Sequence, residues 1–177
     1  MTATKIIVRF VVLALTMMSA ACNGPTHPPS DISVAMGPEI SQPLVRVHLV
    51  GVQDGADLIK FRTKGLVDDW FKAGNQLRAT KERYQVVKEM ILDKGKQPAM
   101  VLAADDPIWA KWKEHGAKWL VVLANLPALN ADGEDDTRIY PLPLDSKRWS
   151  DPITISITIS PAGVPMHVVP TPKPAKD

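Results

Sequence analysis

The sequence predicts a mainly β protein, an antiparallel β-sandwich with one or two short helices. Two observations support this prediction: residues 44–52 and 153–159 alternate with the two-residue period of a strand, and residues 118–124 form a continuous apolar run. A third observation argues against a doubly wound α/β sheet, because helices and strands do not alternate regularly and no glycine-rich phosphate loop occurs.

At least four strands are predicted within the folded part of the chain. Residues 44–52 have the pattern of a strand with one buried face, whereas the run KWLVVLA at residues 118–124 suits a strand buried on both faces. Residues 153–159 carry β-branched side chains on both faces, which favours a strand. Residues 138–144 contain two prolines, so this segment is expected at the edge of a sheet.

One helix is well signalled at residues 107–116. Its start carries the sequence Asp-Asp-Pro, which can cap and initiate a helix, and its end carries a glycine that suits a left-handed stop. A shorter helix is predicted over residues 66–72. Residues 76–92 are ambiguous: their polar first half could be helical, and we favour a strand for residues 84–92 followed by a turn at residues 94–96.

The first 21 residues have the composition of a secretion signal. Lys5 and Arg9 precede an apolar run from Phe10 to Met18, which is too short to cross a ~30 Å hydrocarbon core as a helix. Small residues end the segment, and the only cysteine of the chain, Cys22, follows directly. We therefore predict that residues 1–21 are a signal peptide.

Cys22 is predicted to carry a lipid. Ser19-Ala20-Ala21-Cys22 resembles the lipobox of bacterial lipoproteins, in which the cysteine receives a diacylglyceryl group, although the first position is usually Leu and here it is Ser. Two alternatives stay open: ordinary signal peptidase could leave Cys22 as a free thiol, or the segment could remain uncleaved. Asn23 follows the cysteine, and lipoproteins without Asp at this place usually go to the outer membrane. The expected location is therefore the cell outer membrane.

The mature chain is predicted to hold one domain between two proline-rich ends. Residues 22–43 are expected to be a flexible tether, residues 44–160 the β-sandwich domain, and residues 161–177 a C-terminal tail. No second cysteine exists, so no internal disulfide is expected. Outside the signal segment, 19 basic residues balance 19 acidic ones. This balance argues against nucleic-acid binding and leaves membrane attachment to the lipid.

No catalytic residue, metal site or cofactor site is predicted. His27, His48, His115 and His167 are not spaced as metal ligands on one element, and no Gly-x-Ser-x-Gly motif occurs. The acidic stretch Asn130–Asp136 places oxygen atoms at alternate positions, as calcium loops do. Its glycine comes two places too early, however, and the distal Glu is missing. A solvated hairpin loop is the preferred interpretation, and calcium binding is a minor hypothesis.

The chain contains five tryptophans, at positions 70, 109, 112, 119 and 149. Exposed aromatic rings could form a platform for sugars or peptides. The preferred interpretation is core packing, because each tryptophan lies in an apolar local pattern and Trp109 and Trp112 share one helix face. Trp149, between charged neighbours, is the best candidate for an exposed anchor.

The order of segments resembles the outer-membrane lipoprotein of the type VI secretion membrane complex. The resemblance rests on the lipobox and tether, an opening strand at Val45–Leu49, a buried strand at Trp119–Ala124, and a tryptophan-bearing stretch before the strand Ile153–Ile159 and Gly163. It implies a transthyretin-like sandwich without enzymatic activity. The helix at 109–116 and the loop at 130–137 have no counterpart in that pattern.

The resemblance also implies a role and a site. Members of that family anchor an inner-membrane-anchored secretion component to the outer membrane, and the loop after the first strand docks on the partner's periplasmic domain. The matching stretch here is Gln53, Asp54, Gly55, Ala56 and Asp57. The expected function is a structural adaptor with a periplasmic or inner-membrane-anchored protein partner. The alternative is a periplasmic glycan- or peptide-binding module that uses exposed tryptophans, and an envelope hydrolase is the least favoured class.

Overall fold

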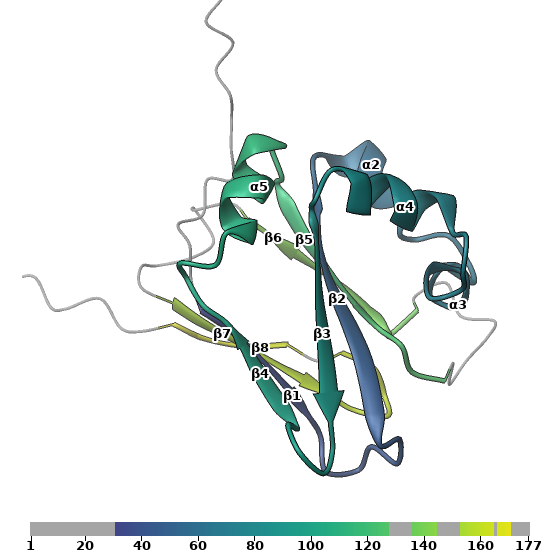
Figure 1. Ribbon diagram of the computed structural model, residues 1–177, viewed down its shortest axis with the longest axis vertical. Helices are drawn as coiled ribbons and strands as arrows, with labels where there is room; N and C mark the ends of the chain where they lie inside the picture. The colour runs from purple at the N-terminus through teal and green to yellow at the C-terminus, as the bar shows by residue number, and fades with distance from the viewer. Residues whose placement is uncertain (1–30, 128–135, 145–152, 165, 171–177) are drawn as a thin grey trace, which may run out of the picture.

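Two four-stranded sheets pack face to face in this protein (Figure 1). The structure, a computed structural model, describes residues 31–127, 136–144, 153–164 and 166–170. The strand order is β4-β1-β7-β8 in one sheet and β3-β2-β5-β6 in the other. We call these the β1 sheet and the β2 sheet. The predicted β-sandwich is confirmed.

The β1 sheet combines strands from the start, the middle and the end of the described chain. It contains β4 (Ala99–Leu102), β1 (Ile32–Met36), β7 (Ile153–Ile159) and β8 (Met166–Pro170). β1 runs antiparallel to β4 and parallel to β7, and β7 runs antiparallel to β8. The parallel β1–β7 pair joins segments more than one hundred residues apart in the chain, so the two ends of the domain are held together by one ladder.

The β2 sheet is antiparallel throughout. It contains β3 (Val87–Asp93), β2 (Leu44–Val52), β5 (Trp119–Ala124) and β6 (Ile139–Pro143). β6 lies at an edge, as its two prolines predicted, because a proline cannot donate a ladder hydrogen bond. The predicted strands at 44–52, 118–124 and 138–144 are therefore confirmed.

Three short helices follow β2 along the chain and cover the outer face of the β2 sheet (Figure 1). They are α2 (Gly55–Lys60), α3 (Leu66–Trp70) and α4 (Gln76–Arg83), which we call the helical layer. α5 (Ile108–Glu114) connects β4 to β5 and ends before Gly116, whose φ of 63° is the left-handed conformation predicted there. The described part thus holds four helices instead of the one or two predicted.

Two apolar clusters result from this arrangement. The inner cluster lies between the sheets and includes Trp112 of α5, whose Nε1 donates to the Val86 carbonyl at 2.9 Å. Trp112 also packs on Gly51, where an added Cβ would approach the indole Cδ1 to 2.4 Å. The outer cluster lies between the β2 sheet and the helical layer, and Trp70 and Phe61 are its largest side chains.

The two clusters explain the continuous apolar run in β5. Leu120 and Val122 belong to the inner cluster, whereas Val121 and Leu123 belong to the outer one. Successive side chains of a strand point to opposite faces, so both faces of β5 need apolar residues. A strand buried on both faces was predicted for this segment, and the structure confirms it.

The predicted tether and tail are wrong where the structure describes them. Within residues 22–43, β1 occupies a central position in its sheet, and Ile32, Val34 and Ile40 are fully buried. The prolines that suggested a tether flank this strand and do not interrupt it. Within residues 161–177, Val164 is buried and β8 pairs with β7. Residues 1–30 and 171–177, with Cys22, lie outside the described residues.

The ambiguous segment at 76–92 divides into a helix and a strand. α4 ends at Arg83, and Gln85 with φ of 56° turns the chain into β3, which starts at Val87 and not at residue 84. The predicted turn at 94–96 follows β3. No helix within the described ranges is both long and apolar enough to cross a membrane.

Candidate functional site

The predicted partner-binding stretch Gln53–Asp57 lies where β2 leads into α2. It is not a free loop, since Gly55, Ala56 and Asp57 form the first turn of α2. The Asp54 side chain accepts a hydrogen bond from the Asp57 backbone N–H at 2.8 Å and so caps the helix. The stretch that the resemblance implied to be a loop is therefore in part a helix start.

This stretch meets the ends of two other helices. The Gln53 side-chain amide donates to the His115 carbonyl at 2.8 Å, which connects it to the end of α5. The His115 ring lies 5.3 Å from the ring of Tyr84, which follows α4 and is half exposed. We call the surface formed by Gln53–Asp57, Tyr84 and His115 the helical end. It brings together residues from three parts of the chain.

Asp57 has a structural task within the helical end. It accepts hydrogen bonds from Lys81 of α4 and from Lys60 of α2. Burial opposes ionisation of Asp57, but these two lysines outweigh it and hold the pKa of the carboxyl below its ordinary value. Asp57 and Lys81 are both largely buried, so this ion pair fixes α2 to α4. The exposed residues of the helical end are Gln53, Asp54, Gly55, Ala56 and Tyr84.

The strand order changes how the resemblance maps onto the chain. The first strand is β1, so the segment after the first strand is residues 37–43 and not Gln53–Asp57. These two segments lie at opposite ends of the sandwich (Figure 1). Lys94 ties the first of them down, because its Nζ donates to the carbonyls of Pro38 and Ile40. Residues 37–43 are thus the segment that follows the first described strand, and the helical end carries the exposed side chain of Tyr84.

His48 lies beneath the helical layer on β2. Its Nδ1 accepts a hydrogen bond from the indole Nε1 of Trp70 at 3.1 Å, and its Nε2 lies 3.3 Å from Glu89. The Trp70 donor requires an unprotonated Nδ1. Burial lowers the pKa of His48, although Glu89 opposes this effect. His48 is buried because Trp70 of α3 covers it.

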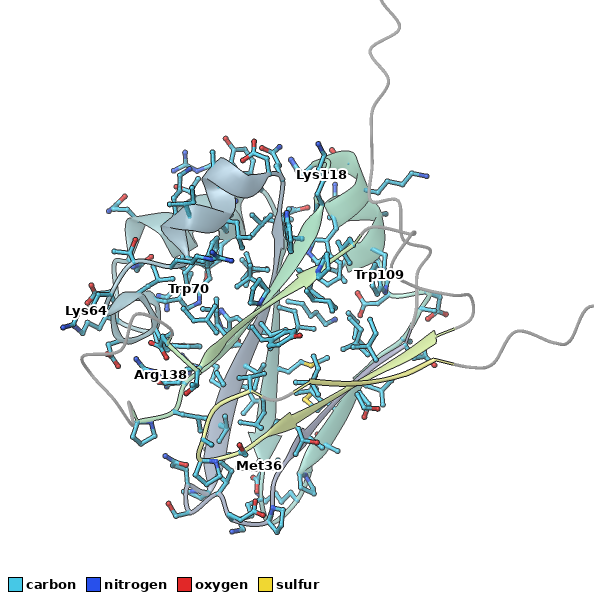
Figure 2. The ribbon with its side chains drawn as sticks, turned by 180° about the vertical axis from the view of Figure 1, so that it is seen from behind. Met36, Lys64, Trp70, Trp109, Lys118 and Arg138 are labelled. Atoms are coloured by element: carbon cyan, nitrogen blue, oxygen red, sulfur yellow. The ribbon has the colours of Figure 1, made fainter. Side chains whose placement is uncertain are left out.

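Arg138 connects the helical layer to the edge of the β2 sheet (Figure 2). Its buried guanidinium donates to the carboxylates of Asp136 and Asp68 and to the Leu126 carbonyl. The hydrogen bonds that Arg138 donates to the carboxylates of Asp136 and Asp68 raise the pKa of Arg138, and the same contact lowers the pKa of Asp68. Asp136, the last residue of the stretch considered for calcium, is thus engaged by an arginine.

Among the residues that the structure describes, no three His, Cys, Asp or Glu side chains are grouped to hold a metal ion. Residues 130–135 lie outside the described part, so the calcium hypothesis for that stretch is not tested.

The tryptophans whose side chains the structure describes serve the core. Trp70, Trp109 and Trp112 are buried, and Trp119 is partly buried against the outer cluster. Trp70 and Trp109 point inward in Figure 2. The preferred interpretation of core packing is confirmed for these residues, which removes them from a ligand platform. Trp149 lies outside the described residues.

The described part of the protein is a β-sandwich of two four-stranded sheets with one helical layer. Comparison with solved structures finds similar chains among type VI secretion proteins. The C-terminal domain of the T6SS protein TssM from EAEC shows 15% identity and a TM-score of 0.51, over 78% of this chain and 99% of that one. This similarity supports a common fold.

Two further solved structures are similar to this chain. The T6SS lipoprotein TssJ1 from Pseudomonas aeruginosa has 13% identity and a TM-score of 0.47, over 82% of this chain and 100% of that one. Lip from Serratia marcescens, a membrane-bound component of the type VI secretion system, has 12% identity and a TM-score of 0.45, over 78% and 98%. No family model matches the sequence, and no curated protein matches it.

Proposed function

We propose that this chain is a non-enzymatic lipoprotein that acts as a structural adaptor in the membrane complex of a type VI secretion system. In this proposal Cys22 carries the lipid, the protein sits at the outer membrane, and the folded domain holds a protein partner in the periplasm. The observation that carries the proposal is the fold, which extends over nearly the whole of a solved type VI secretion domain. The lipobox-like Ser19–Cys22 supplies the argument for the anchor.

We propose further that the partner docks on the helical end. Tyr84 supports this choice because aromatic side chains are frequent at the centres of protein interfaces, and half of this one is exposed. The Asp54 cap and the Asp57–Lys81 ion pair hold the surface in place before binding, which reduces the entropy lost on association. Residues 37–43 are the competing surface that strand order favours.

Affinity purification from detergent-solubilised envelopes tests the adaptor role. Tagged full-length protein should recover other type VI secretion components, and recovery of none would contradict the proposal. Two variants separate the competing surfaces: Tyr84→Ala at the helical end, and Glu39→Ala, an exposed residue of the 37–43 segment. Loss of recovery with Tyr84→Ala alone supports the helical end, and loss with Glu39→Ala alone transfers the contact to residues 37–43.

Membrane fractionation tests the anchor separately. The variant Cys22→Ser should leave the membrane fraction, because the balanced charge of the mature chain offers no basic surface to bind lipid headgroups. If this variant still sediments with membranes, lipid attachment at Cys22 is wrong. The folded domain should be unchanged in it, since Cys22 precedes the first described strand.

A further inference from the structure

The edge strand β4 has backbone groups without a partner in the described part of the protein. Among the described strands, β4 pairs only with β1. The Met36 N–H donates to the Pro98 carbonyl at 2.8 Å. Because hydrogen-bonded and non-hydrogen-bonded pairs alternate along an antiparallel ladder, Met100 and Leu102 bond to β1. The N–H and C=O groups of Ala99 and Val101 then point away from the sheet.

Among the described residues, the edge strands β3 and β6 carry protecting features, and β4 carries none. Exposed edges are usually blocked by proline, by charged side chains or by a covering segment. β6 contains two prolines, and β3 carries Lys88 and Glu89 in ion pairs. β4 has the sequence AMVL, without a charge or a proline, and Val101 is 62% exposed. This edge is therefore suited to accept another uncharged strand.

The charges on either side of β4 indicate which strand it accepts. Lys96 precedes β4 and Asp105 follows it; both are exposed, and neither takes part in an ion pair with any described residue. Their neighbours are committed elsewhere, since Lys94 bonds to the Ile40 carbonyl and Asp106 to Lys88. The segment thus runs from an available positive charge to an available negative one.

We propose that β4 pairs antiparallel with β4 of a second copy of this chain. A twofold axis near Met100 would place Ala99 opposite Val101 of the second copy, so that their free N–H and C=O groups bond each other. The same axis brings Lys96 of each copy to Asp105 of the other. Parallel pairing would instead bring like charges together. The two β1 sheets become one continuous sheet, with the helical layers away from the joint.

The charges favour the antiparallel orientation but add little to the free energy of association. Exposed ion pairs add little free energy, but opposing like charges disfavour a wrong register. The strand is short, so we expect a weak dimer whose population rises with protein concentration. Confinement to a membrane surface would raise the effective concentration of the two copies.

Sedimentation velocity of the detergent-solubilised full chain over a concentration series tests the dimer. The wild type should show a reversible dimer. Lys96→Glu and Asp105→Lys should each raise its Kd about tenfold, since each replaces two attractions by two repulsions. The double variant should restore the wild-type Kd. Lys118→Glu, the same charge change at an exposed residue beside β5, is the control and should leave Kd unchanged.

A proline variant tests the backbone pairing. Val101→Pro removes an N–H that points away from β1, so the fold should persist by circular dichroism while the dimer is lost. A wild type that stays monomeric at all concentrations overturns the proposal. So does a dimer that the charge exchange fails to restore, because its interface lies elsewhere. Neither result bears on recovery of secretion components, which tests the adaptor role separately.

Discussion

The outer faces of the two sheets differ in what covers them. On the β2 sheet, the helical layer buries Val50, Val52, Val121 and Leu123. On the β1 sheet no described helix lies over the outer face (Figure 1), and the outward side chains that the structure describes on β4, β1 and β7 are small and uncharged. These are Ser33, Ala35, Ala99, Val101, Ser156 and Thr158. One sheet is therefore an interior layer of the protein, whereas the other presents backbone and small side chains.

This difference in covering determines which parts of each sheet a protein partner can contact. A partner of the β2 sheet must bind the helices or their ends, because the sheet itself is enclosed. A partner of the β1 sheet can approach the strands directly. The proposed adaptor contact accordingly uses the helical end, and the proposed self-association uses β4.

Removing Trp70 should have the largest effect on this contrast. Its side chain is fully buried in the outer cluster and bonds His48, so Trp70→Ala should lower the free energy of unfolding by about 3–5 kcal/mol. Urea unfolding measures the loss, and hydrogen exchange should increase first in α2, α3 and α4. Ile59→Ala, at a residue that is 66% exposed, is the matched control and should change stability little. If exchange increased equally in the helical layer and in the two sheets, the helical layer would not be a separate unfolding unit.

Two valine-to-alanine variants compare the contribution to stability of the enclosed face of the β2 sheet and the open face of the β1 sheet. Val121→Ala on the enclosed face of the β2 sheet should cost about 2 kcal/mol, because it deletes buried methyl groups and leaves a cavity. Val101→Ala on the open face of the β1 sheet should cost less than about 0.5 kcal/mol. Thermal unfolding at low protein concentration compares them. Similar costs at the two positions would mean that another segment covers the β1 sheet.

The smallest expected effect is a pH dependence through His48. Its pKa in the folded protein lies below the ordinary 6.5, so the unfolded chain binds a proton more readily. Stability should be complete above pH 6.5 and fall as the pH drops from 6.5 toward the folded-state pKa, by at most about 1.4 kcal/mol per pH unit.

The control for this experiment must keep the contacts that His48 makes with the groups around it. They are Glu89, Arg46 and Arg78 as charged groups, with Trp70 and Phe71 as rings. His48→Gln keeps an acceptor for the Trp70 N–H but does not titrate, so its stability should depend less on pH in this range. An identical pH profile in the two proteins would assign the effect to another group.

Strong local patterns made part of this fold predictable. β2, β5 and β7 have long alternating or continuous apolar runs, and α5 has clear start and stop residues. β1 escaped prediction because its five residues lie among prolines, and its burial depends on pairing with β7 far along the chain. β4 and β8 are equally short and were not predicted as strands.

The site was harder to predict than the fold. Asp54-Gly55 has the composition of a turn, and only the contact of Asp54 with the Asp57 N–H makes it a helix cap. Tyr84 and His115 meet Gln53 through the packing of three elements, and spacing in the sequence carries no sign of that meeting. The spacing pattern Asp54-x-x-Asp57 is the one signal that could have indicated a helix start.

The early start of β1 limits how far the domain can stand from a bilayer. If the lipid is on Cys22, as proposed, nine residues separate it from Ile32, where β1 begins. Even fully extended, they span about 30 Å, less than half the length of the tether first expected. The domain would then lie within about 30 Å of the lipid headgroups. A partner spanning the periplasm would then have to come to the membrane to meet it.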